Sequence, residues 1–414
     1  MPDCSIRRIP MKRSPQRPYL LIIILVAILL RLAISFYLGD TVPNNTDETS
    51  YSALGERLAA GHGYTFDRGW YPFTPPETPT AHWSFLYSAF VAVVYRVFGV
   101  HPLAARIAGA VLGGILLPWT VYHLSRRLFV EPRSAPLSSR SLSTSQSLSL
   151  LAAFLAAVYF LFVRYGASLM TETFYIVALL WTLERGLALQ QYVRGGAGSP
   201  RRWLGIGAGL GVALAIATLL RQSVLPWALV MGLWLLWRGW KHRSVGFAFR
   251  ALALAALIVM GAVLPFTIRN YIAYDDFLLL NSNAGYAMYS AQHPMHGVSF
   301  KEYEAAPIPT ELNDLNEAQL DKQLMRRGFG FILDDPGRYA LLSLSRVPDY
   351  FEFWPTRDTS LINNLGRVLS IGVLLPFMIY GVWLAVRNPV SSPGHTLLHA
   401  EDVAFLVLFM AFYA

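Results

Sequence analysis

The chain has 414 residues, of which 54% are hydrophobic and only 14% are charged. Because soluble domains are usually about 25% charged, this composition excludes an ordinary soluble domain and indicates an integral membrane protein. The formal net charge is +9, but the basic residues lie at the ends of apolar runs and form no single basic face, so no nucleic-acid partner is indicated. The single cysteine, Cys4, excludes an internal disulfide bond.

Apolar runs of near-bilayer length recur along the chain, and a spanning helix needs about 20 mostly apolar residues. They predict an all-α polytopic membrane protein with about nine transmembrane helices and two long outer loops. The predicted spans are Leu20–Leu38, Leu103–Leu124, Leu148–Val163, Phe174–Leu189, Trp203–Leu220, Val224–Trp237, Ala251–Ile268, Leu369–Val386 and Val403–Ala414.

These spans divide the chain into four parts. They are a cytoplasmic N-terminus (1–19), a transmembrane region (20–268) that includes the first outer loop (39–102), a second outer loop (269–367), and C-terminal transmembrane helices (368–414). Because the last residues lie inside an apolar run, we expect a fragment or truncated product that lacks further helices.

Loop charges orient the spans, because cytoplasmic loops carry an excess of Lys and Arg. Basic residues precede the first span, and alternation places the other strongly basic short loops on the same side. We therefore predict a multi-pass protein of the plasma (inner) membrane with a cytoplasmic N-terminus and a periplasmic or extracellular active site. The acids on the cytoplasmic side are Asp3, Glu131, Glu184, Glu401 and Asp402; the others lie outside, mostly in the two long loops.

Two stretches of the outer loops predict helices that lie in the membrane interface. Residues 84–98 are apolar, but they carry Arg96 near their end, and a span here would reverse every later loop against the charge rule. A second interfacial helix is predicted after Asp335 and Pro336.

A carboxylate pair follows the first span and opens an amphipathic helix. Asp47 and Glu48 lie in its first turn, apolar side chains from Tyr51 to Leu58 share one face, and Gly61 suits its end. First-turn carboxylates complement the helix dipole, which is one sufficient explanation. The alternative is that Asp47 stays ionised at the membrane surface and accepts a proton from an incoming hydroxyl or amine.

Motifs around this pair resemble the glycosyltransferase family 39, which comprises the protein O-mannosyltransferases and bacterial relatives such as the lipid A aminoarabinose transferase. The resemblance covers nearly the whole chain, in order. It rests on Asp47-Glu48-x-x-Tyr51, residues 58–64, Pro79–Trp83, Ala105-Arg106, Leu169–Glu172, Pro265–Asn270 and residues 280–285.

The resemblance implies a GT-C-like fold and an inverting transfer of a sugar from a polyprenyl-phosphate donor. It implies that Asp47 is the general base and that Glu48 orients Asp47 or the acceptor. The acceptor class stays open between lipid, glycan and protein, and membrane lipids surround the protein. Glu77 belongs to an element whose next residue is basic in the aminoarabinose branch; here Thr78 takes that place. Another cation must then contact the lipid phosphate.

Arg269 is our first candidate for that cation and Arg221 the second, although either can be a snorkelling interfacial arginine. Arg31, inside the first span, is either functional or in a salt bridge with an outer-loop carboxylate. Glu172 is either a second active-site acid or a helix-capping carboxylate.

His82 and Asn270 belong to the resembling motifs and are predicted to bind substrate. No cofactor is firmly implied. A divalent metal is an option at His293 and His296 with Glu77, but two histidines in a loop are a weak signal. The glycine-rich residues 205–211 lie within a span and indicate close helix packing instead of a nucleotide-binding loop.

A competing interpretation is a transporter or flippase of a lipid-linked saccharide. Transporters often show inverted repeats and charges near the bilayer midplane, whereas this sequence shows no repeat and concentrates its acids in outer loops. A third interpretation, a structural subunit of an envelope complex, would make Asp47 dispensable.

Overall fold

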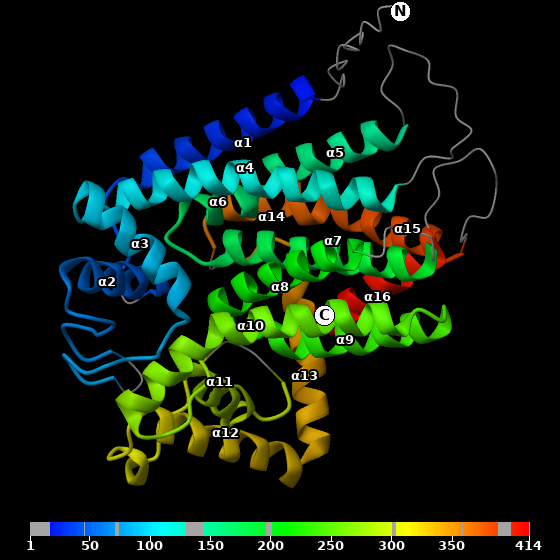
Figure 1. Cartoon of the computed structure of the whole chain (residues 1–414). Coiled ribbons are helices and arrows are strands. Elements are labelled where there is room, and N and C mark those ends of the chain that lie inside the picture. Colours follow the sequence, from blue (N-terminus) through cyan, green and yellow to red (C-terminus); the bar gives the residue numbers. More distant parts are fainter. Residues whose placement is uncertain are drawn as a thin grey trace, which may run out of the picture.

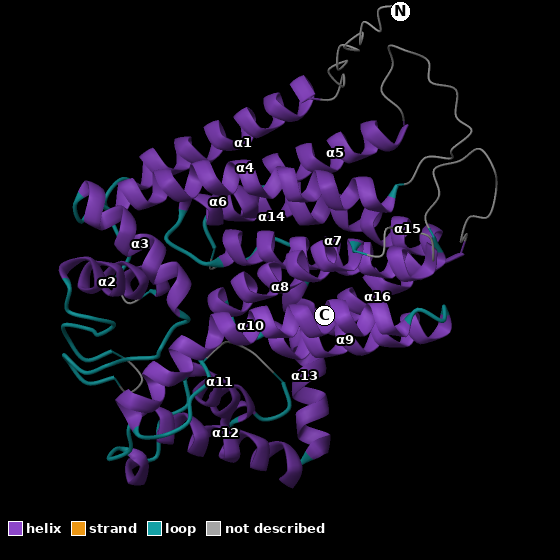
Figure 2. Cartoon of the chain, viewed as in Figure 1, coloured by secondary structure: helices purple, strands orange, loops and turns teal. Residues whose placement is uncertain are grey.

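The computed structural model describes residues 17–44, 46–70, 74–129, 144–195, 201–299, 304–357, 359–387 and 399–413. Within these ranges the chain is helical, and its β-structure amounts to two isolated bridges, Thr65 with Pro79 and Trp70 with Thr74. The prediction of an all-α membrane protein is confirmed at this level (Figures 1 and 2).

The long helices form a bundle, and a group of shorter helices lies at one end of it (Figure 1). In chain order they are α1 (Arg17–Leu38), α2 (Asp47–Ala60), α3 (Phe85–Phe98), α4 (Pro102–Leu128), α5 (Thr144–Val158), α6 (Phe160–Ala167), α7 (Glu172–Gly195), α8 (Arg202–Leu220), α9 (Val224–Lys241), α10 (Val245–Tyr274), α11 (Asn283–Gln292), η1 (Pro294–His296), η2 (Thr310–Leu312), α12 (Glu317–Asp334), α13 (Pro336–Tyr350), α14 (Leu361–Arg367), η3 (Val368–Gly372), α15 (Val373–Arg387) and α16 (Ala400–Tyr413).

The number of predicted spans was wrong. A helix forms in each of the nine apolar runs, but among the described residues only five are long and apolar enough to cross a membrane: α1, α4, α8, α10 and the continuous Leu361–Arg387. The bent pair α5 and α6, which turns by 54°, makes a sixth if it is one span. Helix α7 carries charged residues along its length, α9 ends in Arg238 and Lys241, and α16 has 14 residues, so none of the three meets both conditions.

The bend between α5 and α6 explains the buried Arg31 of α1. Its Nη1 donates to the carbonyl oxygens of Ala27 (2.9 Å) and Ala157 (3.1 Å), and its side chain is fully buried. A helix end leaves carbonyl groups without partners inside the helix, and Arg31 satisfies one of them at the end of α5. The alternative of a salt bridge between Arg31 and an outer-loop carboxylate is wrong, because Arg31 makes none within the described residues.

Helices α8 and α10 pack closely through the predicted glycine stripe. A Cβ atom on Gly207 would lie 2.7 Å from the carbonyl oxygen of Ala251, and one on Gly211 would lie 2.8 Å from the Cα of Ala255. Only glycine permits this approach, so the packing interpretation of residues 205–211 is confirmed. Beside these helices, α7 and α9 bury Leu187, Trp227 and Met231 in the same core.

The first predicted outer loop and the part of the second that holds α11 and α12 lie at one end of the bundle, where α2 and α3 also gather (Figure 1). The end of the predicted second loop does not, because α14 lies among the long helices beside α6 and belongs to the continuous helix Leu361–Arg387. Helices form where the interfacial helices were predicted, at α3 and α13. The two loops are joined directly, because the backbone N–H of Ser282 donates to the carbonyl oxygen of Ala81 over 2.8 Å. Side chains far apart in sequence are therefore brought together at this end.

Candidate active site

Helix α2 begins at the predicted carboxylate pair. Asp47 and Glu48 occupy its first turn, where they complement the helix dipole. Tyr51 and Leu54 are buried on its inner face, and Gly61 ends it with φ 85°, a left-handed conformation that glycine adopts without strain. The amphipathic helix predicted from the sequence is thus confirmed.

Glu48 ties the start of α2 to the bundle. Its Oε2 accepts from the guanidinium of Arg106 on α4 (2.9 Å) and from the backbone N–H of Leu169, just before α7 (3.0 Å). Arg106 is itself buried and also donates to the carbonyl oxygen of Gly39 over 2.6 Å. A carboxylate held by a buried guanidinium and a backbone amide is fixed in position, so Glu48 anchors α2 while Asp47 next to it stays exposed.

Glu172 and Arg221 form an ion pair beside Asp47. The carboxylate of Glu172, at the start of α7, accepts from Arg221 Nη2 over 2.5 Å, and Arg221 Nε also donates to Thr171 Oγ1 over 2.9 Å. Burial of one side of Asp47 and the negative charge of Glu172 raise the pKa of Asp47, while Arg221 opposes them. The structure therefore brings Asp47, Glu172 and Arg221 into one electrostatic cluster. A raised pKa makes Asp47 a stronger proton acceptor.

Aromatic rings separate the Asp47 cluster from a small cavity lined by Arg269. Tyr51 packs against Tyr87 and Trp83 with ring centroids 5.0 and 5.2 Å apart, and Trp83 Nε1 donates to Ser50 Oγ over 2.7 Å. Burial raises the pKa of Tyr51, so its hydroxyl keeps its proton. Trp83 also lines this cavity, so it contacts both Tyr51 and the cavity.

That cavity has a volume of about 210 Å³, and Arg269 is part of its lining. Arg269 Nη1 donates to the carbonyl oxygen of Thr80 (2.8 Å) and to Asn270 Oδ1 (3.0 Å), and no carboxylate lies within 4.0 Å of it in the described residues. Asn270 is buried and donates to the carbonyl oxygens of Leu278 and Leu280. Among the described residues no carboxylate therefore pairs with the positive charge of Arg269, which carbonyl oxygens hold in position.

Glu317 is the residue of this region that the sequence analysis missed. Its side chain is 4% exposed, and its carboxylate accepts hydrogen bonds from both outer loops. The donors are the Thr74 hydroxyl, the Thr80 hydroxyl (2.8 Å), the Ala81 backbone N–H (2.8 Å), the Ser282 hydroxyl (2.9 Å) and the Tyr274 hydroxyl (3.1 Å). In sequence it is an ordinary first-turn acid of a helix. Because five donors converge on its carboxylate, Glu317 holds the residues of the Arg269 cavity and the first outer loop together.

Glu77 and His82 do not join the Asp47 cluster. Glu77 is exposed, pairs with Arg57 of α2 and has a positive φ of 58°. His82 is 7% exposed and packs on Trp83 with centroids 4.6 Å apart. Burial lowers the pKa of His82 to about 4, so the ring is neutral at pH 7.

The proposed divalent-metal ligands do not converge either. His296 Nε2 lies 2.9 Å from the carbonyl oxygen of Ser290, His293 packs on Tyr289 and Phe331, and Glu77 is paired with Arg57. Across the described ranges no group of three His, Cys, Asp or Glu residues is placed to hold a metal ion.

No protein-family model matches the chain, and no curated protein matches it. Its fold is similar to that of the Archaeoglobus fulgidus oligosaccharyltransferase in the apo form, with a TM-score of 0.57 and 14% sequence identity over 97% of this chain and 48% of that one. The oligosaccharyltransferase AglB from the same organism, in complex with an inhibitory peptide and a dolichol-phosphate, aligns with a TM-score of 0.47 and 12% identity, over 96% and 38% of the two chains. The chain thus spans less than half the length of either structure.

Proposed function

We propose that this protein is a GT-C-type membrane glycosyltransferase. It transfers a sugar from a polyprenyl-phosphate carrier to an acceptor on the outer face of the plasma membrane, with inversion at the anomeric carbon. The observation that carries the proposal is that Asp47, with its raised pKa, and the Arg269 cavity lie on the two sides of one aromatic group, Tyr51 and Trp83, at one end of a fold shared with an oligosaccharyltransferase. The family 39 motifs and the loop charges support the donor class and the orientation.

In the proposed reaction Asp47 takes a proton from the acceptor hydroxyl or amine as that group attacks the anomeric carbon. The bond between this carbon and the phosphate oxygen breaks, and the polyprenyl phosphate leaves with the electron pair. The proton on Asp47 is then released to water. Glu48 holds the first turn of α2 in place through Arg106, so the carboxylate of Asp47 keeps its position during the transfer.

Arg269 is the better candidate for the cation that stabilises the leaving phosphate. Arg221 is paired with Glu172, whereas Arg269 donates to carbonyl oxygens, forms no ion pair within the described residues and lines a cavity. A guanidinium beside a developing phosphate charge stabilises the transition state. Arg269→Lys should retain part of the transfer and Arg269→Gln much less, and both should weaken inhibition by added polyprenyl phosphate, which a purely structural role would not change.

Asp47→Asn tests the proposal with a matched control. Asn keeps the size of Asp47 but cannot accept the proton, so transfer from a polyprenyl-phosphate sugar should fall by about 10²–10⁴-fold. Asp67→Asn makes the same change at an exposed acid of the same loop and should leave transfer unchanged. Unchanged transfer by the Asp47 variant would move the base to Glu172. No transfer from any such donor by the wild-type chain would overturn the enzyme and favour the flippase.

A further inference from the structure

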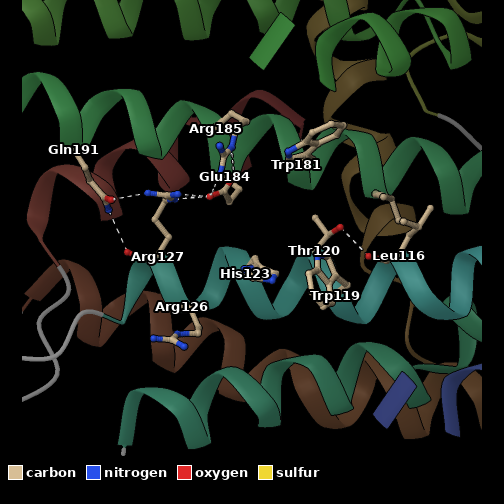
Figure 3. A pocket seen from close by; sticks show the side chains of 11 residues that line it. Leu116, Trp119, Thr120, His123, Arg126, Arg127, Trp181, Glu184, Arg185 and Gln191 are labelled. Carbon is tan, nitrogen blue, oxygen red and sulfur yellow. Dashed lines mark hydrogen bonds and ion pairs between the residues drawn. The ribbon is translucent and has the colours of Figure 1, made fainter. Parts of the chain in front are cut away.

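Helix α7 carries two groups of charged side chains, and they are held to different degrees. Toward its end, Glu184 is buried and both of its carboxylate oxygens are bound, Oε1 by Arg127 Nε over 2.6 Å and Oε2 by Arg185 Nε. Figure 3 shows this group at the wall of a cavity between α4 and α7, where Arg127 also donates to Gln191. Its own hydrogen bonds are therefore enough to fix this group.

The group at the start of α7 is held less firmly. Glu172 binds Arg221 through Oε1, and its buried Oε2 has no hydrogen-bond partner among the described residues. Arg221 Nε donates to Thr171 Oγ1 over 2.9 Å, and the Arg221 side chain is 39% exposed. An ion pair that is open to solvent contributes little by itself. The position of this guanidinium therefore depends on a further contact.

Tyr175 supplies that contact. It follows Glu172 by three residues on α7, so the two side chains share one face of the helix. The guanidinium carbon of Arg221 lies 5.8 Å from the centroid of the Tyr175 ring, within the range of a cation–π contact. The Tyr175 hydroxyl lies 3.2 Å from the hydroxyl of Tyr413 on α16, at hydrogen-bond distance. The ring is thus tied to α16 at its hydroxyl and lies against the cation.

We propose that Tyr175 is a positioning residue for the transfer, because its ring holds the guanidinium of Arg221 beside Glu172 and Asp47. The inference rests on the proposed function, since it concerns the base of that reaction. The hydroxyl pair with Tyr413 fixes the orientation of the ring, so α16 takes part in holding the cation.

The position of Arg221 matters because its charge acts on the proton of Asp47. Burial and Glu172 raise the pKa of Asp47, and Arg221 lowers it. The neighbouring Glu48 is neutralised by its own ion pair with α4. A nearby opposite charge favours the ionised carboxylate, so a guanidinium that left its position would leave Asp47 protonated up to a higher pH. Tyr175 thus acts on the base through Arg221.

The test follows two curves against pH. One is kcat/KM for transfer, and the other is labelling of Asp47 by a water-soluble carbodiimide, which reacts with the protonated carboxyl and needs no sugar donor. Tyr175→Leu removes the ring and should move both curves to higher pH, by at most the shift that Arg221→Gln produces. Tyr175→Phe keeps the ring and should stay near the wild type. In the Arg221→Gln background Tyr175→Leu should add no further shift, because residues that act through one group are not additive.

Tyr192→Leu is the matched control, because it removes a tyrosine of similar exposure from the other end of the same helix, where it packs on Phe247. It should leave both curves in place. If Tyr175→Leu is not monodisperse in detergent, Tyr175→Met removes the ring with a longer side chain and carries the same expectation.

Four results would overturn the role of Tyr175. They are an equal shift in the Tyr192 variant, no shift in Tyr175→Leu, a shift as large in Tyr175→Phe, and a further shift in the Arg221→Gln background. Labelling curves that move as expected while no variant and no wild-type chain transfers sugar would overturn the proposed function and still assign Tyr175 to the positioning of Arg221. Transfer that responds to Arg221→Gln and not to Tyr175→Leu would overturn this inference alone.

Discussion

The carboxylate of Glu317 accepts a hydrogen bond from the backbone N–H of Ala81 over 2.8 Å, across 236 residues of chain. The same carboxylate binds hydroxyl groups of both outer loops. Because Thr80 and Ala81 also line the Arg269 cavity, the position of Glu317 sets the geometry of the candidate phosphate contact. Stability and function of this end of the protein should therefore depend on one buried acid.

Glu317→Gln should destabilise the outer region by about 1–3 kcal/mol. The amide NH₂ would face donors that cannot all reorient, above all the backbone N–H of Ala81, and an unsatisfied buried donor costs this much. The measurement is the midpoint of unfolding in detergent, together with the rate of proteolysis in the outer loops. Glu77→Gln is the control, since Glu77 is exposed and its ion pair with Arg57 contributes little. Equal midpoints for the two variants would contradict the role of Glu317.

A glycine pair gives a second prediction about the same region. A Cβ atom on Gly285 would overlap the backbone carbonyl of Asp321, where α11 meets α12, whereas nothing lies near a Cβ on Gly330. Gly285→Ala should therefore cost about 1–3 kcal/mol or more, because the backbone at Asp321 cannot move aside easily. Gly330→Ala, inside α12, should be neutral or stabilising by up to about 1 kcal/mol. Thermal unfolding of the two variants measures the contrast, and a normal midpoint for Gly285→Ala would contradict this packing.

The amphipathic α2 could be predicted from sequence because its signals are local. A first-turn carboxylate pair, an apolar face and Gly61 all fall within the helix itself. The long apolar helices were predictable for the same reason. The role of Glu317 was not, because its partners Thr80 and Ser282 are distant in sequence and its own surroundings are those of an ordinary surface helix.

The count of spans failed for a related reason. Apolar content marks a buried helix as well as a spanning one, and α7 buries Leu183 and Leu187 while it carries Glu184 and Arg185 for polar contacts. Arg31 shows the same limit, since its partner carbonyl at Ala157 exists only because the chain bends between α5 and α6. Tertiary contacts decided each of these cases.

The raised pKa of Asp321 predicts that the outer region is more stable in mild acid. Burial, with a smaller contribution from Glu317, raises the pKa of Asp321 to about 7, while the Gly285 N–H opposes it. The folded state therefore holds the proton up to a higher pH than the unfolded chain, whose aspartate titrates near 3.9. The stabilisation is complete below about pH 4 and is lost as the pH rises through 7, on the order of 2–4 kcal/mol in total.

Unfolding midpoints at pH 5 and pH 8 test this dependence. Asp321→Asn stays neutral throughout, so its midpoint should exceed that of the wild type at pH 8 and fall less between the two values. Asp314→Asn changes an exposed acid before α12 and should keep the wild-type dependence. A wild-type dependence in the Asp321 variant would assign the titration to another group.

The pH profile of sugar transfer should identify Asp47 as the titrating base. A general base works only as the carboxylate, so kcat/KM should rise with pH through its pKa. Burial and Glu172 raise the pKa of Asp47 above its usual range, and Arg221 lowers it. Glu172→Gln should therefore move the acidic limb of the profile to lower pH, and Arg221→Gln should move it to higher pH. Asp67→Asn should leave the limb in place.

The opposite signs of the two shifts distinguish titration of Asp47 from a loss of structure, which would lower the plateau of the profile without moving its acidic limb. Shifts of the same sign in both variants, or none, would mean that a group other than Asp47 accepts the proton.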